Sequence, residues 1–199
     1  MNDLKVFIKS YWDYFLEIEE QFLETKKFVD YDKINSKTFS IEYLKLYQAV
    51  CSEIDVVGKE IACSVEPSFK IDRNTNIKKW GYIIQNKFPS LKNIHIIFND
   101  EIEIYPFKNW EYEEFIDKKG RRGLRIVGNK QAITWWRDYN KVKHQRIGLV
   151  TNTKNFCLAN QENLILAYSA LYLIEIMYID SFDCKNDIDI KPSKLFKIK

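Results

Sequence analysis

Apolar residues recur at spacings of three and four over long stretches of this chain. Such spacing gathers them on one face of an α-helix, because a helix turns once about every 3.6 residues. The first stretch shows the pattern, with Phe7, Tyr11, Phe15, Ile18 and Phe22 in one stripe. The spacing predicts helices over the following ranges: 3–28, 41–64, 74–87, 134–146 and 160–179.

Polar residues at the helix ends sharpen these boundaries. Ser40 is the predicted N-cap of the second helix and Thr134 that of the fourth, because short polar side chains accept hydrogen bonds from free backbone N–H groups. The last helix has two candidate caps, Asn155 and Asn160. Gly58 stands inside the second helix, where glycine costs about 1 kcal/mol relative to alanine. We therefore expect another helix to pack closely against Gly58.

One segment departs from the helical period. Residues 101–104 are Glu-Ile-Glu-Ile, an alternation with period two that is typical of a β-strand, and Asn99 and Asp100 mark a turn before it. We predict a small β-hairpin inserted between helices over 93–107, too small to stand alone. Its predicted strands are 93–98 and 101–107.

Composition indicates one globular domain. Apolar residues make up 46% of the 199 residues and aromatic residues 15%, which is enough for a substantial core. The pattern contains no internal repeat and no low-complexity tract. The sequence therefore predicts a single all-α domain over 1–199, an antiparallel helical bundle with the β-hairpin at 93–107 inserted.

Location and redox state follow from two further features. The N-terminal segment is charged throughout and lacks the apolar core of a signal peptide, and the longest uncharged apolar run, 163–174, is too short to span a bilayer. We expect a cytoplasmic protein without a membrane partner.

The cysteines are scattered: Cys51, Cys63, Cys157 and Cys184. They form no zinc-type spacing with His95 or His144, so we expect reduced, mostly buried thiols and no metal or other cofactor.

Charge is unevenly distributed, although the formal net charge is only +3. Residues 1–66 hold thirteen acidic residues against eight basic ones, whereas residues 117–146 hold ten Lys or Arg against two acids. A positive field of this kind favours an anionic partner, above all nucleic acid. The alternative is a basic surface without a specific partner. Residues 117–130 contain three glycines without P-loop spacing, so we expect a flexible basic loop there and no nucleotide-binding loop.

The fourth predicted helix, in the stretch WWRDYNKVKHQR, carries the residues with the most chemical potential. At 100° per residue, Arg137 and His144 differ by about 20° around the helix axis and lie roughly 10 Å apart along it. Asn140 lies between them on the same face. One face therefore presents a guanidinium, an amide and an imidazole.

These three groups suit a phosphodiester. Arginine pairs with phosphate oxygens, and histidine moves protons near neutral pH. No carboxylate cluster suited to two Mg²⁺ ions is evident, so we expect a metal-independent reaction that uses the ribose 2′-hydroxyl of RNA. The alternative is structural: His144 is a surface residue, Arg137 pairs with Asp138, and the two tryptophans anchor the helix in the core.

The same stretch resembles the HEPN superfamily. Arg137, the polar Asp138 and His144 fit the form with a six-residue gap, and the Tyr-Asn and Lys-His pairs, followed by an Ala/Leu-rich last helix, resemble bacterial HEPN-like proteins. The resemblance covers about residues 100–180 and is only architectural before them. It implies a catalytic pair, Arg137 and His144, supported by Asp138 and Asn140.

The resemblance also implies a biological role and partners. HEPN proteins are commonly RNA-cleaving toxins or effectors in phage defence that work as homodimers, and an antitoxin or defence-system protein is then an expected partner. Basic residues expected to contact RNA are Lys118, Lys119, Arg121, Arg122, Arg125, Lys141, Lys143 and Arg146. Two alternatives stay open: a non-catalytic HEPN-like module that binds RNA, a nucleotide or a protein, and a structural subunit such as an antitoxin.

Overall fold

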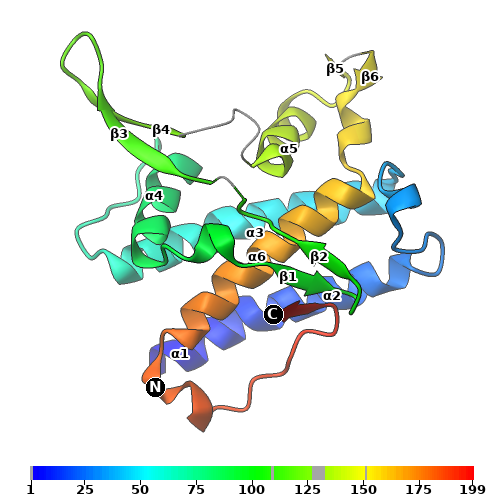
Figure 1. Cartoon of the computed structure of the whole chain (residues 1–199), viewed down its shortest axis with the longest axis horizontal. Coiled ribbons are helices and arrows are strands. Elements are labelled where there is room, and N and C mark those ends of the chain that lie inside the picture. The colour runs from blue at the N-terminus through cyan, green and yellow to red at the C-terminus, as the bar shows by residue number, and fades with distance from the viewer. Residues whose placement is uncertain (1, 109, 127–132, 151) are drawn as a thin grey trace.

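The computed structural model describes residues 2–108, 110–126, 133–150 and 152–199 (Figure 1). Three long helical segments form its body. The first consists of α1, a π-helical turn and α2, and the others are α3 and α6; two shorter helices, α4 and α5, pack on one side. The helices are α1 (Asn2–Phe7), α2 (Asp13–Thr25), α3 (Ile41–Val65), α4 (Ile77–Lys87), α5 (Thr134–His144) and α6 (Gln161–Asp180).

All five predicted helices form, with shifted ends. The first ends at Thr25, before the predicted boundary, and contains a π-helical turn over Ile8–Trp12. The third begins at Ile77 because the Asn76 side chain caps it, accepting a hydrogen bond from the Lys78 N–H. The fourth ends at His144, two residues early.

The directions of the long helices correct the prediction of an antiparallel bundle. A β-bridge between Phe39 and Asn160 places the starts of α3 and α6 side by side. At the other end, the Tyr178 hydroxyl donates a hydrogen bond to Ser64 Oγ at 2.6 Å. Helices α3 and α6 therefore run in the same direction, and only the first helical segment runs against them.

Helix α3 confirms two expectations about its sequence. The Ser40 Oγ accepts a hydrogen bond from the Tyr43 N–H at 3.0 Å, so Ser40 is the N-cap. At Gly58, a Cβ atom would come within 2.7 Å of the Trp80 ring of α4. The Trp80 Nε1 donates to Asp55 Oδ1 at 3.0 Å and fixes this contact. Glycine is therefore required for the close approach of α4.

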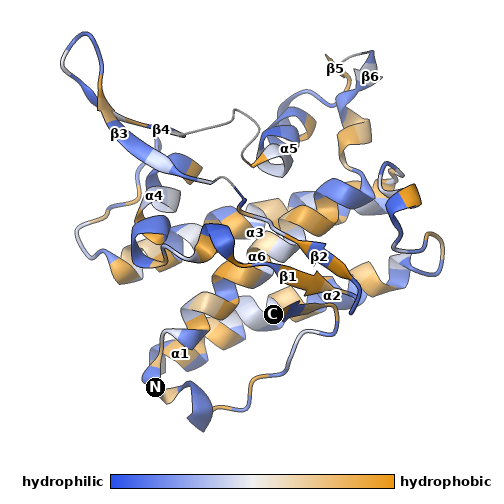
Figure 2. Cartoon of the chain, viewed as in Figure 1, coloured by the Kyte–Doolittle hydropathy of each residue, from blue (hydrophilic) through white to orange (hydrophobic). Residues whose placement is uncertain are grey.

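Helix α6 is the central helix of the core. Its N-cap is Asn160, whose side chain accepts a hydrogen bond from the Asn163 N–H. Its apolar side chains cover the whole circumference, and the helix crosses the middle of the molecule (Figure 2). Among the described residues it is the one helix long and apolar enough to cross a membrane, but 78% of that window is buried within the protein. This burial is compatible with a soluble protein.

Strands make the prediction of an all-α fold wrong: the described residues are 56% helix and 13% strand, and they contain three small sheets. The first sheet contains β1 (Ile96–Phe98) and β2 (Ile102–Ile104), which pair antiparallel. Residues 99–101 form the turn between them, in which Asn99 and Asp100 have left-handed φ values of 51° and 61° and the Glu101 N–H donates a hydrogen bond to the Phe98 carbonyl. The strand β7 (Phe196–Ile198) pairs with the other edge of β1, so the predicted insertion is part of a three-stranded sheet.

The C-terminal segment is held in place by a buried carboxylate. Glu19 of α2 accepts hydrogen bonds from the Ser193 hydroxyl, the Lys194 N–H at 2.9 Å and the Leu195 N–H at 3.2 Å. The Phe196 ring then packs against the body of the protein. These contacts hold the C-terminal segment against α2, near the start of the chain.

The second sheet replaces the predicted flexible loop. Strands β3 (Tyr112–Ile116) and β4 (Arg122–Ile126) form an antiparallel hairpin that projects from the body beside α4 (Figure 1). We call residues 112–126 the basic arm. Of the predicted loop over 117–130, residues 117–121 form the turn of this hairpin, whereas the prediction is wrong for 122–126, which form β4; residues 127–130 lie outside the described part of the chain. The third sheet pairs β5 (Leu149–Val150) with β6 (Thr153–Lys154).

The cysteines are free thiols. Only Cys51 is buried, whereas Cys63, Cys157 and Cys184 are partly exposed, so the expectation of mostly buried thiols is wrong for three of the four. Burial raises the pKa of the Cys51 thiol well above its usual value, because the thiolate would lose its hydration. Cys51 is therefore a core residue.

Candidate functional site

Helix α5 is anchored by one face. Trp135, Tyr139 and Val142 are buried there. The Tyr47 hydroxyl of α3 donates a hydrogen bond to the Trp135 carbonyl, and Trp135 Nε1 donates to the Pro106 carbonyl at 3.0 Å. These contacts fix the rotation of α5 about its axis, and so they fix the direction of its other side chains.

The start of α5 corrects the predicted cap. Ile133, and not Thr134, occupies the N-cap position, and no side chain caps the helix there. Ile133 has a left-handed φ of 59°, which is unfavourable for a β-branched residue. Its side chain is buried. Tertiary packing around Ile133 and Trp135 therefore places the start of α5, without help from a local capping signal.

The outward face of α5 carries the three residues that the sequence brought together. Arg137 and His144 are exposed and Asn140 is half-buried. At 100° per residue they lie roughly opposite the buried Trp135 and Val142. The structure thus brings the guanidinium, the amide and the imidazole to one solvent-facing surface, which we call the α5 face.

Asp138 lies at the edge of the α5 face and holds two cations. Arg137 Nε donates to Asp138 Oδ1 at 3.3 Å, and Lys141 Nζ donates to the same oxygen at 2.9 Å. The Asp138 side chain is only 12% exposed, whereas that of Arg137 is 51% exposed. The mostly buried Asp138 carboxylate therefore positions the exposed Arg137 side chain.

Asn140 and His144 differ in how they are held. Asn140 Nδ2 donates to the Trp136 carbonyl one turn earlier at 2.8 Å, so the amide is fixed against its own helix. Among the described residues, the ion pairs of α5 are those of Asp138, and none includes His144. The His144 imidazole is thus exposed at the last turn of the helix.

The two remaining basic candidates flank the α5 face. Lys143 Nζ lies 5.5 Å from the centre of the Tyr139 ring, within the range of a cation–π contact. Arg146 Nη2 donates to Gln48 Oε1 of α3 at 3.2 Å. Both cations are exposed, so both can meet a phosphate backbone that crosses α5.

The hydroxyl groups beneath α5 are structural. Burial raises the pKa of Tyr139 to about 12, with Cys51 and Asp55 adding to the rise, and it raises that of Tyr47 well above its usual value. Both phenols therefore stay protonated at neutral pH. Neither phenol can therefore act as a general base.

The basic arm is shaped by Asp117. Its carboxylate accepts hydrogen bonds from the Lys119 N–H at 2.8 Å, the Arg121 N–H at 2.9 Å and Arg121 Nε at 2.7 Å. These bonds to Arg121 and Lys119 lower the pKa of Asp117. Gly120 completes the turn with a left-handed φ of 75°. A charged turn residue therefore orders what the sequence predicted as a loop.

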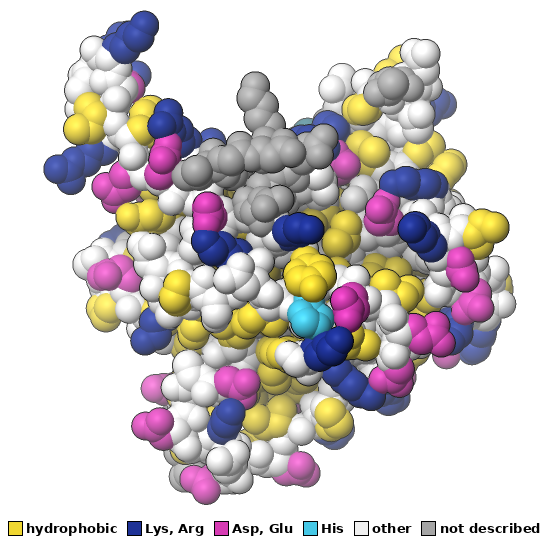
Figure 3. Space-filling model, in the orientation of Figure 1, with side chains coloured by type: hydrophobic (Ala, Val, Ile, Leu, Met, Phe, Trp, Pro, Cys, Tyr) yellow, Lys and Arg dark blue, Asp and Glu magenta, His cyan; other side chains and the backbone are white. Residues whose placement is uncertain are grey.

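The cations of the basic arm fall into two groups. Arg121 pairs with Asp117, and Arg125 pairs with Glu113 across the strands. The others are exposed and have no ion pair within the described residues: Lys118, Lys119 and Arg122. Figure 3 shows dark blue side chains gathered on this projection at the upper left. These three cations are available to an anionic partner.

The basic arm and the α5 face are separate surfaces. Both strands of the arm pack on α4, and α4 touches α5 through Trp80 and Trp136, whose rings stand perpendicular with centres 6.5 Å apart. The structure therefore places one helix between the two groups of predicted site residues. Within the described part of the chain, no group of His, Cys, Asp and Glu side chains is arranged to hold a metal ion.

Sequence reasoning missed residues on α4. Lys78, Lys79 and Tyr82 line a groove against β4, together with Arg122. The signal was present as two adjacent lysines in the first turn and a tyrosine one turn after Lys78. It went unused because only the pairing of α4 with β4 gives these side chains a common surface.

Comparison of the chain with protein-family models, curated proteins and solved structures finds no match. The comparisons therefore show no family for this chain.

Proposed function

We propose that this protein is a HEPN-type endoribonuclease that cuts RNA without a metal ion. The observation that carries the proposal is the α5 face: Arg137, Asn140 and His144 share one exposed surface on a helix that is anchored on its opposite side. The resemblance of the α5 stretch to HEPN proteins supports the same assignment. Asp138 supports it further, because it holds Arg137 in position.

The chemistry follows from the groups present. The His144 imidazole takes the proton of a ribose 2′-hydroxyl, and the oxygen attacks the adjacent phosphorus. The bond from phosphorus to the 5′-oxygen breaks, and that oxygen receives a proton as it leaves. Arg137 pairs with the phosphate oxygens as negative charge builds on them. The products are a 2′,3′-cyclic phosphate and a 5′-hydroxyl.

A second copy of the chain completes the site in this proposal. The α5 face lies at the surface, and one His144 cannot be base and acid at the same moment. A homodimer that brings two α5 faces together supplies a second imidazole to protonate the leaving oxygen. It also excludes water around the phosphate, which strengthens the contact with Arg137.

The test is cleavage of single-stranded RNA in EDTA. The intact protein should yield 2′,3′-cyclic phosphate ends, and an RNA with 2′-deoxyribose at the cut position should resist cleavage there. The His144→Gln variant should lose at least about a hundredfold in rate, the typical contribution of general acid–base catalysis. RNA left uncut at high protein concentration would refute the nuclease.

The matched control is the other histidine. His95 precedes β1 and is not part of α5, and its ring is tilted against that of Tyr105 with centres 5.1 Å apart, so His95→Gln should cleave at the rate of the wild type. Equal loss in both histidine variants would mean that the loss reports folding, and the assignment of His144 would fall. Circular dichroism of both variants shows whether they are folded.

We place this nuclease in phage defence or among toxins, as the HEPN resemblance implies. RNA cleavage in the cytoplasm arrests growth, and an antitoxin or another defence protein would restrain it. Induced expression in growing bacterial cells should stop growth with the wild type and leave it unaffected with His144→Gln. Equal growth arrest by both chains would contradict this role.

The basic arm favours a second candidate function, a non-catalytic HEPN-like RNA-binding module. Lys118, Lys119 and Arg122 are exposed without ion pairs in the described part of the chain, and they lie away from α5. In this case RNA binding weakens steeply with salt, because phosphate contacts release counterions. Substituting these three cations weakens binding, whereas His144→Gln changes nothing that can be measured.

A further inference from the structure

A groove lies between the start of α4 and strand β4, at the base of the basic arm. Helix α4 forms its floor, and the arm forms its wall. Its main lining side chains are Lys78, Lys79, Tyr82, Glu114, Arg122 and Leu124. Two elements that are distant in sequence thus build one surface.

The charges of the groove favour an anion. Three cations face one carboxylate, that of Glu114. Lys79 also reaches Asp72 at 3.3 Å, but both side chains are substantially exposed, so this ion pair is weak and can exchange for a phosphate. Within the described residues Lys78 and Arg122 have no ion pair. The N-terminus of α4 opens at Asn76 into the same groove and adds positive partial charge.

The groove also offers an apolar platform. Tyr82 and Leu124 are half-buried and stand among the cations. An aromatic ring next to lysine and arginine side chains suits an unpaired nucleobase, which stacks on the ring while its phosphates meet the cations. A duplex keeps its bases stacked inside and has no base to offer. The combination therefore fits a single strand.

The groove and α5 lie on different sides of α4. Trp80 of α4 packs edge-on against Trp136 of α5, with ring centres 6.5 Å apart, whereas Lys78 and Tyr82 lie roughly opposite Trp80 around the helix. We propose that this groove holds single-stranded RNA, with phosphates at Lys78, Lys79 and Arg122 and a base on Tyr82. The choice of RNA rests on the proposed function, whereas the binding site rests on the groove.

The test measures binding of a fluorescein-labelled oligouridine by the full chain carrying His144→Ala, so that the RNA stays intact. The triple variant Lys78→Gln, Lys79→Gln, Arg122→Gln should bind about tenfold or more weakly at moderate salt. The slope of log affinity against log salt should fall by about 2, since each lost phosphate contact on a single strand removes about 0.7. Tyr82→Leu should weaken binding, and Tyr82→Phe should retain it.

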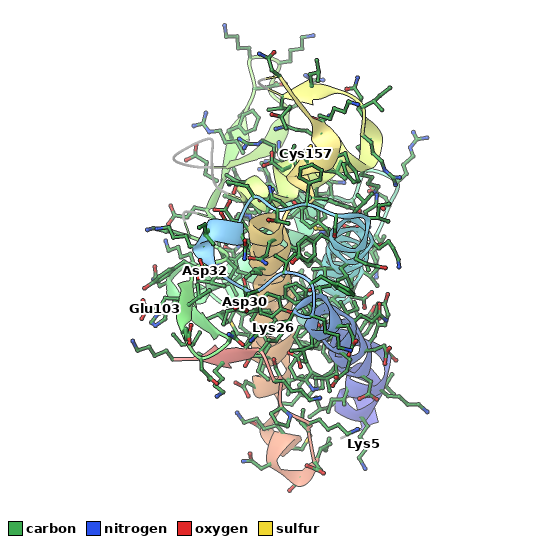
Figure 4. All side chains as sticks on the ribbon, turned by 90° about the vertical axis from the view of Figure 1, so that its right-hand side faces the viewer. Lys5, Lys26, Asp30, Asp32, Glu103 and Cys157 are labelled. Atoms are coloured by element: carbon green, nitrogen blue, oxygen red, sulfur yellow. The ribbon has the colours of Figure 1, made fainter. Side chains whose placement is uncertain are left out.

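The control removes the same charge elsewhere. Lys5, Lys9 and Lys26 are exposed on the first helical segment and just after it, remote from α4; Figure 4 labels Lys5 and Lys26. Their triple substitution to Gln should leave both affinity and salt slope close to those of the unsubstituted background. Equal weakening by the control triple would show a general charge effect and overturn the groove.

The outcomes separate this proposal from the nuclease. If binding depends on the groove residues but the protein with His144 intact cleaves no RNA, the nuclease proposal is refuted and the groove proposal is retained. If the protein with His144 intact cleaves RNA but the groove variants bind RNA as tightly as the background, only the groove proposal is refuted. Duplex RNA that binds as tightly as the single strand, with no effect of Tyr82→Leu, would also overturn the proposed occupant.

Discussion

Two carboxyl groups buried in the protein differ in how many hydrogen-bond partners they have. Glu19 is buried and accepts hydrogen bonds from the C-terminal segment, among them the Lys194 N–H at 2.9 Å. Glu175 of α6 is fully buried, and within the described residues neither of its oxygens has a hydrogen-bond partner. Burial, with Glu53 nearby, raises the pKa of Glu175 well above its usual value. Glu175 therefore weakens the fold whenever it must ionise.

Replacing Glu175 by an apolar side chain of similar length should stabilise the protein. Glu175→Met removes a polar group that lacks partners, and we expect a gain of about 1–3 kcal/mol in the free energy of unfolding at pH 8. Urea unfolding followed by circular dichroism measures it. A loss of stability in this variant would contradict the prediction.

The same substitution should change the pH dependence. A carboxyl whose pKa is higher in the folded than in the unfolded state makes the folded state bind more protons, so stability falls as pH rises above the unfolded pKa, about 4.3. The wild type should therefore lose stability between pH 5 and pH 8 relative to Glu175→Met. Glu53, whose pKa burial also raises, is present in both chains and cancels. Parallel profiles would count against the prediction.

At the scale of the element, helix starts show where local sequence suffices. Ser40 and Asn160 cap α3 and α6 through side-chain oxygens, as the pattern predicted. Helix α5 begins after a left-handed, buried Ile133 without any cap. The starts of α3 and α6 are therefore set by their own local sequence. Helix α5, which presents the candidate site, depends on the elements around it.

The cap of α3 gives a direct test at this scale. Ser40→Ala leaves the Tyr43 N–H without its acceptor and should lower the free energy of unfolding by about 1 kcal/mol. Ser40→Asp supplies another acceptor and should stay near the wild type. Thermal and urea unfolding measure both. Equal destabilisation by Ala and Asp would show that the hydroxyl acts through something other than capping.

At the scale of the whole molecule, the C-terminal strand β7 closes the core. Phe196 is 1% exposed, and its ring lies 5.1 Å from that of Tyr168 and 5.4 Å from that of Phe98, measured between centres. It thus links α6 to the sheet. The strand also covers one edge of β1, which would otherwise present free backbone groups.

Loss of this ring should be costly. Phe196→Ala should lower the free energy of unfolding by about 3–5 kcal/mol, the usual cost of removing a buried aromatic side chain. It should also speed hydrogen exchange of the β1 amides that pair with β7. Ile198→Ala, on the same strand but 40% exposed, is the control and should have a small effect. Similar effects of the two substitutions would contradict a sealing role for Phe196.

The sequence by itself determined the helices, because a helix gathers its apolar residues on one stripe and closes its own backbone hydrogen bonds. The stripe from Phe7 to Phe22, the Ser40 cap and the alternation at 101–104 were all sufficient signals. The spacing of Arg137 and His144 also placed both on one face, since that is a property of a single helix. Their exposure depends on which face of α5 is anchored.

Only the tertiary structure decided the rest. A strand needs a partner from elsewhere in the chain, so the three-residue apolar–polar alternation of β7 was too short to predict a strand by itself, and β4 was predicted as loop because its glycine and arginines lack strand periodicity. The parallel course of α3 and α6 and the groove of Lys78 and Arg122 depend on contacts between distant segments. Local hydrogen bonds can be predicted from neighbouring residues, whereas pairing between distant segments is settled by the packing of the whole core.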